Sequence, residues 1–108
     1  MDTKISGLVV KGDQYGRTLG FPTANLDKPH QEIKAGVYSG TASFDNETHR
    51  AGILINPSGK VEAHLLGFDG DLYGKIMTLE VRKFLREYKK FDSELELKEQ
   101  IRQDLEMC

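Results

Sequence analysis

Three glycines spaced four residues apart, Gly12, Gly16 and Gly20, lie near the start of the chain, with Arg17 among them. Glycine permits left-handed backbone and lets a ligand approach the main chain closely. Amide groups exposed in such a loop can hold an anion. Glycines are also common in ordinary connections, so the loop by itself indicates only a candidate phosphate-binding segment.

Two neutral oxygen donors follow this loop in the run Pro22–Thr23–Ala24–Asn25. Such donors suit a hard cation like Mg²⁺ that also holds phosphate oxygens. The alternative is a turn in which the Thr23 and Asn25 side chains bond to nearby backbone. The run by itself favours the turn; combined with the glycine loop, it makes Thr23 and Asn25 candidate ligands of a magnesium nucleotide.

Glu62 is the candidate general base. Residues 60–66 alternate, with apolar side chains on one face and Glu62 and His64 on the other. A carboxylate in a site can orient a hydroxyl and accept its proton. The alternative is an ordinary glutamate facing solvent, which is the commonest environment of this residue type. We interpret His64 as a structural partner held by hydrogen bonds.

The elements that would position these residues are mostly short strands. Apolar or alternating runs predict strands at 5–11, 36–44, 51–55, 60–66 and 75–85. Residues 45–47 have turn chemistry. After these strands the period changes, because Leu97, Ile101 and Leu105 repeat at helical spacing. Ser93 and Glu96 fit a capping box, which predicts one amphipathic helix from about Glu94 to the C-terminus.

This succession defines the fold class as mainly β. Several short strands followed by one helix favour an antiparallel barrel or sandwich with the helix packed on it. The chain has no βαβ alternation and no phosphate-binding G-x-x-x-x-G-K-[ST] run. Periodicity alone does not separate a barrel from a sandwich.

Length and composition narrow the class of protein further. The 108 residues suit one domain, 1–108. A net charge of −2 shows no basic excess that would indicate nucleic acid as a partner. The single cysteine, Cys108, rules out an intrachain disulfide and fits a reducing compartment. We see no membrane span and no signal peptide. We therefore expect a cytoplasmic monomer with no membrane or nucleic-acid partner.

The chain resembles the riboflavin kinase family along nearly its whole length. The resemblance begins with Leu19-Gly20-Phe21-Pro22-Thr23-Ala24-Asn25, which matches the family's L-G-x-P-T-A-N motif. Four further blocks follow in the family's order: Lys34–Tyr38, Val61–Leu66, Phe68–Lys75, and Phe84–Arg86 followed by Lys90–Ser93. Four ordered blocks in so short a chain are a much more specific signal than the P-T-A-N run alone.

This resemblance implies a closed six-stranded Greek-key barrel and transfer of the ATP γ-phosphoryl group to riboflavin, giving FMN and ADP. It implies that the glycine loop binds nucleotide through Gly12, Gly16, Arg17 and Gly20, and that Thr23 and Asn25 hold Mg²⁺ and phosphate. Glu62 matches the family's catalytic glutamate. Arg86 lies in the family's flap beside the flavin, and Tyr88 would add an aromatic contact. The block that ends at Lys75 would lie near the base and ribose of ATP.

The sequence also departs from the family pattern. Ala63 stands where a larger residue is usual, Glu87-Tyr88 stands where Pro-Glu is usual, and the loop 56–59 is shorter than in many relatives. These departures leave open a non-catalytic flavin- or nucleotide-binding module of the same fold, although Thr23, Asn25 and Glu62 are all retained. A small oligonucleotide-binding barrel ranks last, because few aromatic residues and a balanced charge do not favour it.

Overall fold

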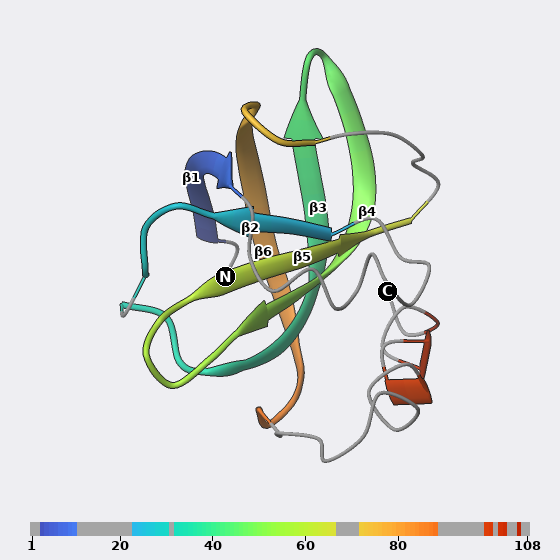
Figure 1. The fold of residues 1–108 in the computed structure, drawn as a ribbon. Helices are drawn as coiled ribbons and strands as arrows, with labels where there is room; N and C mark the ends of the chain where they lie inside the picture. Colours follow the sequence, from blue (N-terminus) through green and yellow to red (C-terminus); the bar gives the residue numbers. More distant parts are fainter. Residues whose placement is uncertain are drawn as a thin grey trace.

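The computed structural model describes residues 3–10, 23–30, 32–66, 72–88, 99–100, 102–103 and 106. Within these ranges it contains six strands: β1 (Thr3–Val10), β2 (Thr23–Leu26), β3 (Gly36–Phe44), β4 (Glu47–Ile55), β5 (Val61–Leu65) and β6 (Ile76–Arg86). They close into an antiparallel barrel in the order β1-β2-β5-β4-β3-β6 (Figure 1). The barrel expected from the family resemblance is therefore confirmed.

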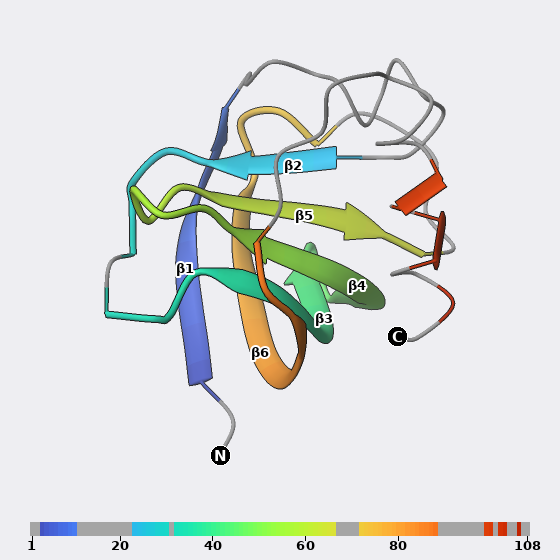
Figure 2. The same ribbon diagram turned by 90° about the horizontal axis from the view of Figure 1, so that it is seen from below.

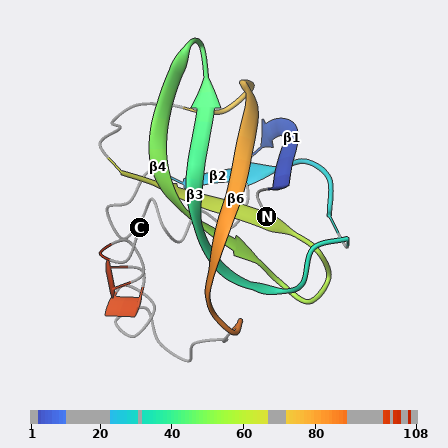
Figure 3. The ribbon, with the colours of Figure 1, turned by 180° about the vertical axis from the view of Figure 1, so that it is seen from behind.

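The strand order is that of a Greek key. Strands β3, β4 and β5 follow one another in space, and β6 returns to lie beside β3. Figure 3 shows β4, β3 and β6 side by side from behind. The β3–β4 turn has Asp45 and Asn46 at its centre with φ of 48° and 64°. Positive φ at both central residues is the geometry that tight two-residue hairpins require.

Four of the five predicted strands match the structure to within about two residues. The fourth strand of the structure, β4, begins at Glu47 rather than at the predicted residue 51. Its first half is polar and exposed, so it has no hydrophobic signal and is a strand because it pairs with β3. Strand β2 was not predicted. This four-residue strand lies between two other strands, because β2 pairs with both β1 and β5.

The described residues include only part of the predicted C-terminal helix. Glu99, Gln100, Arg102, Gln103 and Glu106 are helical. Arg102 binds Glu99 and, at 3.1 Å, Glu106, as side chains one helical turn apart do. The capping residues Ser93 and Glu96 lie outside the described residues, so the start and extent of the helix stay predictions.

The core is the interior of the barrel. Its fully buried side chains come from every strand and include Val9, Ile53, Ile55, Val61, Met77 and Leu79. At Gly40 the backbones of β3 and β6 approach so closely that an added Cβ would lie 1.9 Å from the carbonyl oxygen of Glu80. The register between these strands shifts at Ser39/Gly40. Only glycine permits this close approach.

The short loop between β4 and β5 is held by one side chain. The Asn56 Oδ1 accepts hydrogen bonds from the Ser58 amide at 3.0 Å, the Ser58 hydroxyl at 2.8 Å and the Lys60 amide at 2.9 Å. An asparagine that bonds to the backbone two residues ahead is a common turn-former. The reduced loop length thus gives a tightly bonded hairpin, which leads directly into the strand of Glu62.

Candidate active site

Glu62 and His64 lie on the outer face of the barrel. Their neighbours on β5, Val61, Ala63 and Leu65, are almost completely buried in the core. Because successive side chains of a strand point to opposite faces, Glu62 and His64 point outward. This confirms the alternation inferred from the sequence. Neither residue is freely solvated, since their side chains are only 19% and 9% exposed.

Asn25 on β2 is paired directly with Glu62 on the adjacent strand β5. The β2–β5 pairing sets Asn25 opposite Glu62 and Thr23 opposite His64. Figure 2 shows β2 and β5 lying side by side. Asn25 points to the outer face, because Ala24 is in the core, yet Asn25 is only 2% exposed. The side chains of directly paired residues are close enough to contact each other. The proposed metal ligand and the proposed base are therefore brought together by strand register.

Further residue pairs extend this line across the outer face, with a register shift between β3 and β6 at Val37/Tyr38. Leu54 pairs with Glu62, Val37 with Leu54, and Arg86 with Val37. We call this set the outer row: Asn25, Glu62, Leu54, Val37 and Arg86. Val37 is 2% exposed although it points outward. The outer row thus has a polar end at β2 and β5, an apolar middle, and a cation at β6. Neighbouring strands are about 4.8 Å apart, so roughly 14 Å of sheet separates Glu62 from Arg86.

The Arg86 end of the outer row is tied to the segment before β3. The Arg86 Nη1 donates to the Glu87 carbonyl at 3.0 Å, and Glu87 forms an ion pair with Lys34 at 3.2 Å. The Lys34 ammonium also lies 4.8 Å from the centre of the Phe84 ring. The Tyr38 hydroxyl donates to the Lys34 carbonyl at 2.6 Å. Glu87, one of the departures from the family pattern, therefore joins two segments.

Tyr38 is the buried residue beneath the Arg86 end of the outer row. Its ring meets Phe84 edge to face, with 5.3 Å between the ring centres. Burial raises the pKa of the Tyr38 hydroxyl from its ordinary value, and the nearby Lys34 charge opposes this shift. The neutral hydroxyl is thus the form that the fold stabilises, which suits its role as a hydrogen-bond donor.

The other predicted site residues are only partly located. Gly12, Gly16, Arg17 and Gly20 lie outside the described residues. Thr23 is placed by its backbone in β2. This position makes the alternative turn at Thr23–Asn25 wrong, because both residues are strand residues. Tyr88 lies two residues after Arg86 and is half-buried.

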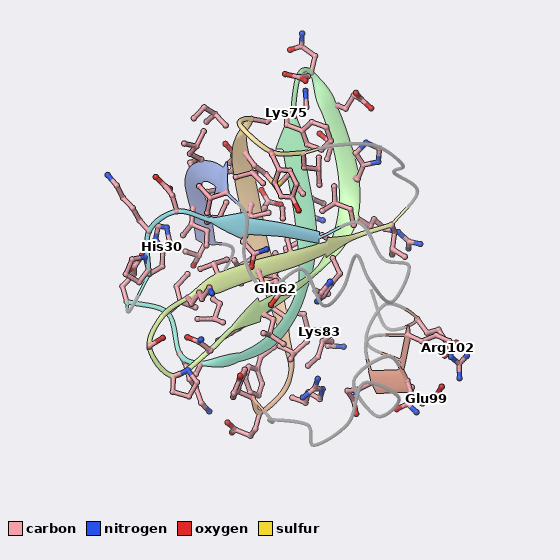
Figure 4. All side chains as sticks on the ribbon, viewed as in Figure 1. His30, Glu62, Lys75, Lys83, Glu99 and Arg102 are labelled. Carbon is pink, nitrogen blue, oxygen red and sulfur yellow. The ribbon has the colours of Figure 1, made fainter. Side chains whose placement is uncertain are left out.

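Lys75 has a structural role of its own. Figure 4 shows Lys75 near the tip of the β3–β4 hairpin, well away from Glu62. Its ammonium group binds the Asp45 carboxylate in the hairpin turn. It lies 6.0 Å from the centre of the Phe44 ring. Lys75 therefore joins the start of β6 to the hairpin.

Sequence reasoning missed two residues of the outer row, Val37 and Leu54. Their signal is visible in retrospect, because each interrupts the alternation of its strand. Val37 precedes the buried Tyr38, and Leu54 stands between Ile53 and Ile55. In each run of consecutive apolar residues at least one side chain must point outward. An apolar residue on an outward position, screened from water, is typical of a small-molecule site.

The donors on β2 suit a cation only when it arrives with phosphate. Among the described residues no three acidic, histidine or cysteine side chains form a group that could hold a metal ion. Asn25 offers a neutral oxygen, and Mg²⁺ commonly combines few protein ligands with phosphate oxygens and water. The residues present therefore fit Mg²⁺ bound with a nucleotide rather than a resident metal.

The closed barrel pairs a carboxylate with a neutral oxygen donor on its outer face, beside the apolar Leu54 and Val37, an arrangement typical of a small-molecule site. The family comparison specifies it further. A family model described as riboflavin kinase matches residues 1–108. The chain belongs to the riboflavin kinase family.

Individual relatives agree with this assignment. The chain is 39% identical over 113 residues to the bifunctional riboflavin kinase/FMN adenylyltransferase of Escherichia coli K12, covering 93% of this chain and 35% of that protein. It is 36% identical over 111 residues to the RNA-binding riboflavin kinase RibR of Bacillus subtilis 168, covering 95% and 48%. The crystal structure of riboflavin kinase from Trypanosoma brucei matches with a TM-score of 0.69 and 27% identity, covering 98% of this chain and 76% of that one.

The chain spans less than half the length of these curated relatives. The activities in their names therefore belong to longer proteins. Within the residues that the structure describes, no helix is long and apolar enough to cross a membrane.

Proposed function

We propose that residues 1–108 form one riboflavin kinase domain, which transfers the γ-phosphoryl group of ATP to the terminal ribityl hydroxyl of riboflavin and releases FMN and ADP. The observation that carries this proposal is the direct pairing of Asn25 with Glu62 at one end of the outer row. Membership of the riboflavin kinase family supports the choice of substrates.

In this proposal riboflavin lies along the outer row. Its reactive hydroxyl lies beside Glu62, and its ring lies toward Arg86, whose planar guanidinium can stack on a ring. Val37 and Leu54 form the apolar floor between them. The polar ends and apolar middle of the row match a ligand with a hydroxylated chain at one end and an aromatic ring at the other. Tyr88 is proposed as a further contact to the flavin.

Phosphoryl transfer requires mainly positioning and stabilisation of charge from the protein. Bound Mg²⁺ would neutralise charge on the transferring phosphoryl group. Asn25 and Thr23 would hold this ion on the nucleotide, and the amides of the Gly12–Gly20 segment would hold the phosphates, with Arg17 nearby. Glu62 orients the riboflavin hydroxyl and accepts its proton. An ordinary glutamate has a pKa near 4.3, so it is a weak base and should take the proton late.

The rival function, a non-catalytic binding module, is less well supported. Such a module needs no carboxylate beside the metal ligand, whereas here Glu62 is held opposite Asn25 and screened from solvent. The monomeric state and cytoplasmic location stay predictions. The absence of a nucleic-acid partner also stays one, since one relative is named as RNA-binding.

The deciding experiment follows FMN by chromatography when the folded protein is incubated with riboflavin, ATP and Mg²⁺. We expect FMN and ADP in equal amounts. No FMN with any nucleoside triphosphate or divalent metal tested would overturn the proposal.

A further inference from the structure

His64 is the outer-face residue next to Glu62 on the same strand. Residues two apart on a strand point to the same side. The His64 Nε2 lies 3.8 Å from the Glu62 Oε1. This distance is longer than a hydrogen bond, but catalytic contacts are often long before substrate binds and shorten in the loaded site. The two side chains therefore lean toward each other along β5.

Burial strengthens this interaction. The His64 side chain is 9% exposed, although it points away from the core. Charges and dipoles interact more strongly when screened from water. The residues paired directly with Glu62 and His64 on the neighbouring strands are Asn25, Thr23, Leu54 and Gly52. None of these four is charged, and on β5 itself the His64 imidazole lies beside the Glu62 carboxylate.

We propose that His64 is a positioning residue for the proposed reaction: its imidazole holds the Glu62 carboxylate in one rotamer beside Asn25. The inference rests on the proposed function, because it concerns the base of that reaction. A glutamate side chain has three rotatable bonds, and contact with an imidazole narrows the set of rotamers that it samples. Holding it in one place matters, since small errors in the position of a catalytic group lower the rate strongly.

Kinetics of two variants test this role. His64→Leu keeps the bulk of the side chain and removes the nitrogen atoms, whereas His64→Gln keeps an N–H donor. We expect His64→Leu to lower kcat about tenfold with KM values within about twofold, and His64→Gln to recover most of the loss. In a Glu62→Gln background, His64→Leu should change kcat less than about twofold, because its effect passes through Glu62. An equal loss of kcat in both backgrounds would overturn the proposal.

The chain offers a matched control in Glu47 and His49. This pair has the same i, i+2 spacing on β4, with 3.2 Å between Nε2 and Oε1, but it lies by the β3–β4 turn. His49→Leu should leave kcat unchanged. If His49→Leu lowers kcat as much as His64→Leu does, the loss reflects removal of a histidine–glutamate pair in general, and the positioning role is wrong.

A measurement without catalysis separates this inference from the proposed function. NMR of the Glu62 side-chain methylene groups at one fixed pH reports whether the side chain occupies one rotamer. We expect distinct methylene proton signals in the wild type and in His64→Gln, and averaged signals in His64→Leu. If Glu62 keeps one rotamer in His64→Leu, the inference fails even when the protein makes FMN. If the wild type makes no FMN but the rotamer depends on His64, only the proposed function fails.

Discussion

Asn25 and Glu62 are directly paired residues of the antiparallel strands β2 and β5, and both point to the outer face of the barrel. Thirty-six residues lie between Asn25 and Glu62 in the sequence, so no local pattern brings them together. Their pairing places a side-chain amide beside a carboxylate at a position shielded from solvent.

Glu62→Gln tests the base. The substitution keeps size and hydrogen-bonding capacity but removes the proton acceptor. General-base help is typically worth about 10²–10⁴-fold, so kcat should fall within that range. The KM values for riboflavin and MgATP should change little, because binding does not need the charge. Steady-state kinetics with thermal unfolding as a fold check will measure this, and near-full turnover would contradict the assignment of Glu62.

Asn25→Ala tests the metal ligand. Loss of the amide oxygen should weaken binding of MgADP about tenfold, which calorimetric titration can measure. Ser43→Ala is a suitable control, because the Ser43 hydroxyl bonds to Thr48 on an exposed part of the hairpin. Equal MgADP affinity in Asn25→Ala and in the control would show that Asn25 does not hold the metal.

Gly40→Ala tests the contact between β3 and β6. The added Cβ would lie 1.9 Å from the Glu80 carbonyl oxygen, so the backbones must separate. We expect a loss of about 3 kcal/mol or more in the free energy of unfolding. At Gly74 no atom lies within 4 Å of an added Cβ, but φ is +81°. Gly74→Ala should therefore cost only about 1 kcal/mol. Urea unfolding of both variants gives the comparison, and similar losses would contradict it.

Tyr38→Phe tests the buried hydroxyl. Burial raises the Tyr38 pKa above its ordinary value of 10.0. The neutral form is then favoured in the folded state, so this group's contribution to stability is complete below pH 10 and is lost as pH rises through the raised pKa. The variant should lose about 1 kcal/mol near pH 8, where the bond to the Lys34 carbonyl is intact. Above pH 10 its stability should fall less steeply than that of the wild type.

Denaturant unfolding at a series of pH values from 8 to about 11 measures this difference. Parallel curves for Tyr38→Phe and the wild type would show that the Tyr38 hydroxyl titrates alike in the folded and unfolded states. The raised pKa of Tyr38 would then be wrong.

The sequence by itself determined the strands with a clear period and the faces of their residues. Alternation in 60–66 put Glu62 and His64 opposite the core, and the structure confirms this. Period-2 alternation is local, because it depends only on neighbouring side chains seeking opposite environments. The turn at Asp45 and Asn46 was likewise readable, since these residue types tolerate positive φ. The closed barrel came from the family resemblance and not from periodicity.

Only the tertiary structure decided which strands pair and in which register. Strand β2 has no hydrophobic signal of its own, yet it joins β1 to β5 and so closes the barrel beside Glu62. Val37 and Leu54 belong to predicted strands, but only register places them between Glu62 and Arg86 on the outer face. Register depends on hydrogen bonds between segments far apart in the chain, and a slip of one residue would turn every side chain to the opposite face. The outer row therefore forms only when the barrel closes, because its residues come from five strands that meet through their pairing.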